Sequence, residues 1–99
     1  MKTREMSYKD YGISRKEEIE LKNRCKKMEQ EECRMLFESA ISANPDIFNQ
    51  IYYSLAEGCS YDELRKIHYI PISKVDFYGY QRKCLYKFKN MLLLSGKLK

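Results

Sequence analysis

The sequence lacks tryptophan, has one histidine, and contains only 4 glycines and 2 prolines in 99 residues. So little glycine and proline favours helices over a loop-rich or collagen-like chain. The longest apolar run covers residues 91–94, far short of the roughly 18–20 residues of a membrane span. The first residues lack the apolar stretch of a secretory signal. These absences predict one small, soluble, cytoplasmic domain with no membrane association.

The cysteines show no metal-binding pattern. Cys25, Cys33, Cys59 and Cys84 contain no Cys-x-x-Cys pair, and His68 is the only histidine. A glycine-rich phosphate loop and a convergent pair of carboxylates are also missing. We therefore expect reduced thiols packed as small hydrophobic side chains, with no metal, no cofactor and no enzymatic activity.

Charge is distributed unevenly along the chain. Residues 1–59 hold ten Lys and Arg against eleven Asp and Glu, whereas residues 60–99 hold nine against three. The net charge of +5 therefore comes from the C-terminal part. This asymmetry favours a polyanion-binding half on a near-neutral body, although a basic face kept for solubility is the alternative.

The N-terminal part predicts a helical scaffold. Residues 1–12 have no periodicity and predict a flexible arm, and residues 13–99 predict a single helical domain with its scaffold at 13–58. No internal repeat or low-complexity segment is present. The fold class predicted is all-α, a small bundle of four to five helices.

Helix boundaries in the scaffold can be read from capping residues. Ser14 and Glu17 form a capping box, and the acidic cluster at 29–32 favours a break before a second helix. Asn44-Pro45-Asp46 predicts a third helix start, and Gly58 predicts its end. The stripe expected to face the core in the second helix is Cys33, Leu36, Phe37, Ala40 and Ile41.

Residues 60–93 have the pattern of a helix-turn-helix. Ser60 and Glu63 form another capping box for a short helix that Pro71 ends, and Ser73 caps a longer helix to about residue 93. A glycine at position 79 of that helix indicates close approach to another backbone. Other side chains expected to pack toward the core are Leu64, Ile67, Tyr52, Tyr69 and Tyr80.

This segment resembles region 4 of bacterial sigma factors, and within that group the sigma-like phage regulators of the ArpU/RinA type. The resemblance covers about 35 residues; it rests on Ser60–Leu64, Ile70–Lys74, Phe77, Tyr80, Arg82–Leu85 and Phe88. Pro71 replaces the glycine usual in the family's turn, and Asp76 puts an acid near the base-reading end. The resemblance implies a transcription regulator from a prophage or mobile element of Firmicutes.

The first functional hypothesis is therefore a sequence-specific regulator that binds double-stranded DNA. The long helix would enter the major groove and the scaffold would supply a homodimer surface or a contact to RNA polymerase. The candidate DNA-binding residues are Lys66, Ser73, Lys74, Val75, Tyr78, Arg82, Lys83 and Lys87.

The second hypothesis is a protein-binding module. A mobile element could use the basic face to inhibit a host protein such as a polymerase or a CRISPR or other defence nuclease. Nine tyrosines suit this function because tyrosine is enriched at interfaces. An exposed and continuous ridge formed by Lys74, Tyr78, Arg82 and Lys83, with Asp76 turned aside, would favour DNA. Asp76 in the centre of this ridge, or another helix covering it, would favour protein.

Overall fold

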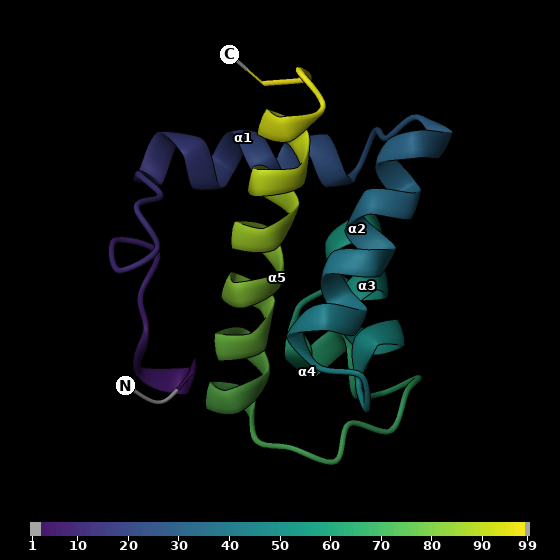
Figure 1. Cartoon of the computed structure of the whole chain (residues 1–99). Helices are drawn as coiled ribbons and strands as arrows, with labels where there is room; N and C mark the ends of the chain where they lie inside the picture. The colour runs from purple at the N-terminus through teal and green to yellow at the C-terminus, as the bar shows by residue number, and fades with distance from the viewer. Residues whose placement is uncertain (1–2, 99) are drawn as a thin grey trace.

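The computed structural model describes residues 3–98, so the predictions for residues 1–2 and 99 lie outside it. Within this range the chain forms helices and no strands, which confirms the all-α bundle (Figure 1). The elements are η1 (Thr3–Glu5), α1 (Arg15–Cys25), α2 (Gln30–Ala43), α3 (Phe48–Glu57), α4 (Tyr61–Leu64) and α5 (Lys74–Leu94), where η1 is a 3-10 helix.

Helix α5 organises the core. It packs along α2 and also contacts α1, α3, α4 and η1 (Figure 1). The spacing of apolar residues along this helix predicts a buried stripe of Phe77, Tyr80, Cys84, Leu85, Phe88, Met91 and Leu92. Of these, Tyr80 and Met91 are half-buried and the other five are buried. The four cysteines are free thiols, and burial raises the pKa of Cys25 to about 12, so it is inert as a nucleophile.

Several predicted helix boundaries are confirmed. Ser14 caps α1 through its Oγ, which accepts from the Glu17 N–H at 3.1 Å. Helix α2 follows Glu29, where the acidic cluster predicted a break. Gly58 ends α3 in the left-handed conformation, with φ 69°. Local capping chemistry therefore determined these boundaries.

The predicted start of α3 at Pro45 is wrong. The Asn44 side chain accepts from the Asp46 N–H at 2.9 Å, and the Ile47 N–H donates to the Asn44 carbonyl at 3.3 Å. This closes a turn at residues 45–46, and the helix begins at Phe48. Ile47 is buried, so the turn brings its side chain into the core before the helix starts.

The predicted stripe of α2 is displaced by one position. Phe37 and Ile41 are 39% and 38% exposed, and Cys33 is half-buried. Helix α2 packs on both α3 and α5, and this rotates its buried face to Met35, Leu36, Ser39, Ala40 and Ala43. The buried Ser39 hydroxyl is satisfied because it donates to the Met35 carbonyl at 2.8 Å.

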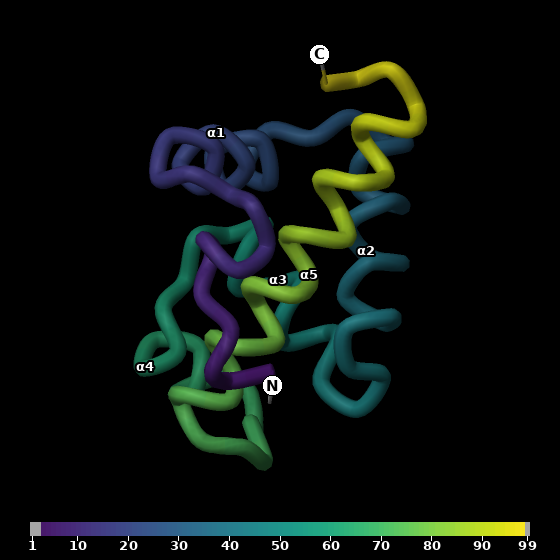
Figure 2. The backbone as a smooth tube through the Cα atoms, turned by 60° about the vertical axis from the view of Figure 1, so that its left-hand side comes forward, coloured from purple at the N-terminus to yellow at the C-terminus, as the bar shows by residue number. Residues whose placement is uncertain are grey.

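The chain predicted as a flexible arm packs along α5. Residues 3–12, called here the N-terminal segment, form η1 and a series of turns beside the first half of α5 (Figure 2). Tyr11 stacks on Tyr86 with ring centroids 4.9 Å apart. This packing leaves no periodic pattern in the sequence because the segment is built of turns and contacts α5 largely through its backbone.

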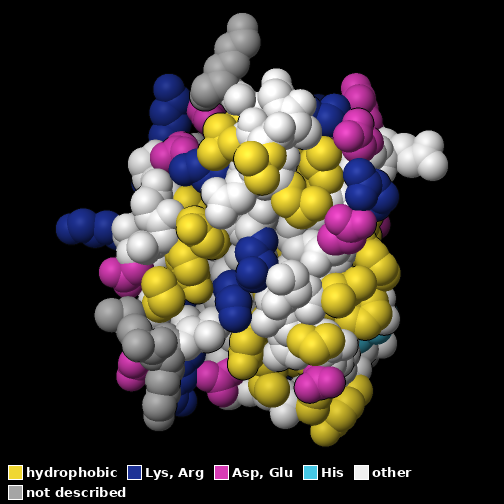
Figure 3. Space-filling view, in the orientation of Figure 1, with side chains coloured by type: hydrophobic (Ala, Val, Ile, Leu, Met, Phe, Trp, Pro, Cys, Tyr) yellow, Lys and Arg dark blue, Asp and Glu magenta, His cyan; other side chains and the backbone are white. Residues whose placement is uncertain are grey.

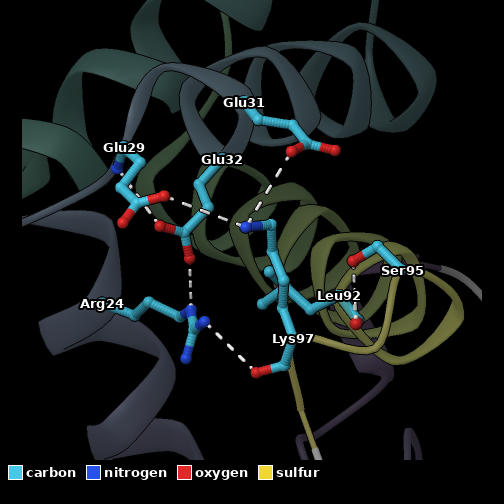
Figure 4. A network of polar contacts seen from close by, with 7 residues as sticks. All are labelled: Arg24, Glu29, Glu31, Glu32, Leu92, Ser95 and Lys97. Atoms are coloured by element: carbon cyan, nitrogen blue, oxygen red, sulfur yellow. Dashed lines mark hydrogen bonds and ion pairs between the residues drawn. The ribbon is translucent and has the colours of Figure 1, made fainter.

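A cluster of charged residues joins α1, α2 and the C-terminal turn (Figure 4). The Arg24 Nε donates to the buried Glu32 carboxylate at 2.6 Å, and its Nη2 donates to the Lys97 carbonyl at 3.3 Å. The Lys97 Nζ lies 4.0 Å from Glu29 and 3.9 Å from Glu31. We call these five residues the polar junction; it lies at the C-terminal end of α5.

Among the described residues, no helix has both the length and the apolar character that a membrane crossing needs.

Candidate nucleic-acid interface

The opposite end of α5 carries a protruding segment that we call the tip, residues 62–75. It contains most of α4, the connection to α5 and the first two residues of α5, at the bottom of Figure 1. Helix α4 has four residues, and the connection of nine residues is longer than the tight turn that the sequence predicted. The structure thus has two capped helices, with an irregular rather than a compact link between them.

Capping and two buried side chains fix the tip to the body. Ser60 Oγ accepts from the Glu63 N–H at 3.2 Å, and Ser73 Oγ accepts from the Asp76 N–H at 3.3 Å. Leu64 and Ile70 are buried, and Tyr61 donates its hydroxyl to the Ile72 carbonyl at 2.8 Å. The connection is therefore anchored at both ends although its middle is exposed.

The middle of the tip exposes apolar side chains. Ile67 is 61% exposed, Tyr69 81% and Val75 59%. The predictions that Ile67 and Tyr69 pack toward the core are wrong, because α4 ends at Leu64 and the helical face that would have buried them does not continue. Tyr52 and Tyr80 are half-buried, as the sequence predicted.

Basic side chains surround these apolar groups. Arg65, Lys66 and Lys74 are exposed, and Lys74 Nζ donates to the Asp62 carboxylate at 2.9 Å. This hydrogen bond is the main cause that lowers the pKa of Asp62, and the charges of Arg65 and Lys66 act in the same direction. Four side chains therefore form one charged group in which three are cations.

Two members of the predicted ridge are held by other parts of the chain. The Tyr78 hydroxyl accepts from the Tyr61 N–H at 2.9 Å. Arg82 Nε donates to the Met6 carbonyl at 2.7 Å, and its Nη2 donates to the Arg4 carbonyl at 3.3 Å. The ridge is thus interrupted, with Lys74 at the tip and Arg82 under the N-terminal segment.

Gly79 shows why this covering is possible. A Cβ at this position would lie 2.7 Å from the Arg4 Cα, which is closer than real contacts allow. The close backbone approach expected from this glycine is confirmed, and the partner is the chain's own N-terminal segment. Nearby, Asp76 accepts from the Ser73 hydroxyl at 3.1 Å and lies 4.0 Å from Arg4, so it acts as a local cap.

Lys83 and Lys87 lie farther along α5. Lys87 lies thirteen positions after Lys74, about 20 Å along the helix at the rise of an α-helix. Both lysines are half-buried. Figure 3 shows Lys and Arg side chains over α5 with hydrophobic side chains on either side. The structure therefore groups Lys66, Ser73, Lys74 and Val75 at the tip and leaves Tyr78, Arg82, Lys83 and Lys87 outside that group.

Sequence reasoning missed three exposed tip residues, namely Arg65, Ile67 and Tyr69. The signal that could have found them is the distance between Leu64, the last inward residue of α4, and Pro71. Six residues lie between them without a glycine C-cap, which is too many for a tight turn and indicates an irregular connection. On that basis Arg65, which lies in the same irregular connection as Lys66, is an equally strong candidate for a phosphate contact.

Comparison with protein-family models gives no match for this chain, and comparisons with curated proteins and with solved structures give none either.

Proposed function

We propose that this protein is a sequence-specific DNA-binding transcription regulator of the phage or mobile-element type, and that it contacts double-stranded DNA through the tip. The observation that carries the proposal is that the acidic side chains at and beside the tip are engaged within the chain, whereas two of its basic side chains are not paired with any described acid. The side chains of Asp62, Glu63 and Asp76 each accept hydrogen bonds inside the chain. Arg65 and Lys66, in contrast, form no ion pair with any residue between 3 and 98.

The first turn of α5 adds a second favourable feature. Its N-terminal end carries a partial positive charge from the helix dipole, and Ser73, Lys74 and Val75 are exposed there. In the proposed complex, Arg65 and Lys66 contact phosphates, and Lys74 exchanges Asp62 for a phosphate oxygen. Val75 then contacts a thymine methyl in the major groove, which supplies sequence preference.

The test is the salt dependence of binding to a short labelled duplex, measured by fluorescence anisotropy. Each neutralised phosphate contributes about 0.9 to the slope of log affinity against log salt. The double substitution Arg65→Gln/Lys66→Gln should therefore lower affinity and reduce this slope by about 2. Selection from a randomised duplex pool should return one preferred motif, with Val75→Ala relaxing a single position.

A matched control removes the same charge elsewhere. Lys16 and Lys27 are exposed, lie in α1 and just after it, and form no ion pair among the described residues. Lys16→Gln/Lys27→Gln should leave the slope unchanged. Equal losses in the two double variants would show attraction to net charge alone and would contradict the tip as a binding surface.

A second candidate, binding of a host protein, is favoured by the interruption of the predicted ridge, where the N-terminal segment covers Arg82, and by the exposure of Ile67 and Tyr69. Exposed aromatic and aliphatic side chains beside cations are common anchors of protein interfaces, and nothing in DNA backbone recognition requires them. A purified bacterial RNA polymerase is the first partner to try. Ile67→Ser/Tyr69→Ser should abolish its binding if the tip is a protein interface, and should leave DNA affinity almost unchanged if the ligand is DNA.

A further inference from the structure

The N-terminal segment lies where a nucleic-acid backbone could lie on α5. It starts beside the first turns of that helix and runs along its outer side (Figures 1 and 2). At Gly79 the approach is so close that no side chain fits between the two backbones. A glycine that admits a neighbouring backbone in this way is unusual on the outer side of a long helix, where alanine is the more stable choice.

Arg82 is the second feature of this covered face. Its guanidinium donates to the carbonyl oxygens of Met6 and Arg4, in the forked arrangement with which guanidinium groups also bind phosphate oxygens. Carbonyl groups are neutral, so they satisfy the hydrogen bonds of Arg82 without neutralising its charge, and Arg82 forms no ion pair with any residue between 3 and 98. A phosphate at the same place would satisfy both the hydrogen bonds and the charge.

Some features of the N-terminal segment stabilise its packing on α5, and one opposes it. The Tyr11–Tyr86 stack and the Arg82 hydrogen bonds favour the covered state. Within the described residues, however, the Tyr8 hydroxyl is buried without a hydrogen-bond partner, and burial is the main cause that raises its pKa. A buried hydroxyl without a partner opposes docking, so the covered state has a cost that release removes.

We propose that the N-terminal segment is an autoinhibitory cover of the DNA-binding surface, and that duplex DNA competes with it for Gly79 and Arg82. This inference rests on the proposed function. In the covered state DNA meets the tip alone; when the segment leaves, Arg82 adds a phosphate contact beside it and the glycine lets the DNA backbone come close. The segment would thus set the affinity of the regulator for DNA.

The test is Gly79→Ala in the full chain. The added methyl would lie against the Arg4 backbone, which cannot move aside as the end of a long side chain could, while alanine keeps α5 helical. We expect faster amide hydrogen exchange over residues 4–12 and about tenfold tighter DNA binding. A tenfold gain corresponds to a segment that covers the helix in about nine molecules of ten, because release then makes every molecule competent to bind. Adding Arg82→Gln should remove that gain.

Asn90→Ala is the matched control, because Asn90 is a half-buried residue later in α5. It should leave both exchange and affinity unchanged. Faster amide exchange in Gly79→Ala without tighter DNA binding would overturn the autoinhibitory contact. If the wild type still bound DNA in that case, the proposed function would stand. Absence of DNA binding by the wild type and by Gly79→Ala would overturn the proposed function itself.

A second variant is needed if the N-terminal segment shifts slightly to make room for the methyl group of Gly79→Ala. Gly79→Ala/Tyr11→Ala also removes the stack on Tyr86 and should release the segment. Unchanged exchange over residues 4–12 in this double variant would contradict a releasable cover.

Discussion

The two ends of α5 use the same kinds of charged side chain in opposite ways. At the polar junction, Arg24 is paired with the buried Glu32, and Lys97 faces two more glutamates (Figure 4). At the tip, Asp62 is paired with Lys74, and the charges of Arg65 and Lys66 act on the same aspartate without forming an ion pair among the described residues. Charged side chains therefore stabilise the fold at one end of the helix, whereas at the other end two cations are left without an ion pair among residues 3–98.

The largest expected effect comes from breaking the polar junction. Arg24→Met removes the partner of a carboxylate that is only 7% exposed and should lower the free energy of unfolding by about 2–4 kcal/mol, because an unpaired buried charge is costly. Urea denaturation measures this loss. The control Arg34→Met breaks the exposed pair with Glu38 and should cost less than about 1 kcal/mol; similar costs for both would contradict the distinction.

The Arg24–Glu32 pair also predicts how the free energy of unfolding depends on pH. Burial alone would raise the pKa of Glu32, but hydrogen bonds from the Glu29 N–H and from Arg24 outweigh it and hold the pKa below the usual 4.5. A lowered folded-state pKa gives stability that is complete above the unfolded value and lost as pH falls through the folded one. The stability difference between wild type and Arg24→Met should therefore be constant near neutral pH. It should narrow as the pH falls through the folded-state pKa of Glu32, first in the variant, where Arg24 no longer lowers it, and then in the wild type.

Chemical denaturation at a series of pH values measures that narrowing. Other carboxylates with lowered pKa values, such as Glu17 and Asp62, titrate in both proteins and so cancel in the difference. If the difference in the free energy of unfolding between wild type and Arg24→Met stayed constant down to low pH, the charge of Glu32 would not be its source.

A smaller effect is expected at the tip. Asp62→Asn removes the acid that occupies Lys74 and that would repel phosphate, so DNA affinity should increase, by about twofold to fivefold for an exposed charge pair. The free energy of unfolding should change little because both side chains are exposed. Anisotropy titrations against the same duplex check this, and weaker binding by Asp62→Asn would contradict the placement of phosphate beside Lys74.

Much of the fold could be predicted because it depends on local chemistry. The capping residues Ser14, Ser60 and Ser73 marked three helix starts, and the spacing of apolar residues in α5 identified its buried face. The rotation of α2 could not be predicted, because the buried position of Ser39 depends on simultaneous contact with α3 and α5.

The candidate site could be predicted only in part for the same reason. Lys66, Lys74 and Val75 are exposed, as a helix-turn-helix pattern requires. The cover over Arg82 could not be found, because it consists of backbone carbonyls from a segment more than seventy residues away. No periodic pattern records such a contact, and the glycine at position 79 was its only sign in the sequence.

The most direct test of the contrast between the two ends is a titration of the isotopically labelled full chain with a short duplex, followed by amide chemical shifts. Shifts should concentrate at residues 62–75 and then at residues 3–12 as the N-terminal segment gives way. The polar junction around Arg24 and Lys97 should remain unperturbed. Shifts centred on the junction, or no shifts at all, would contradict the account.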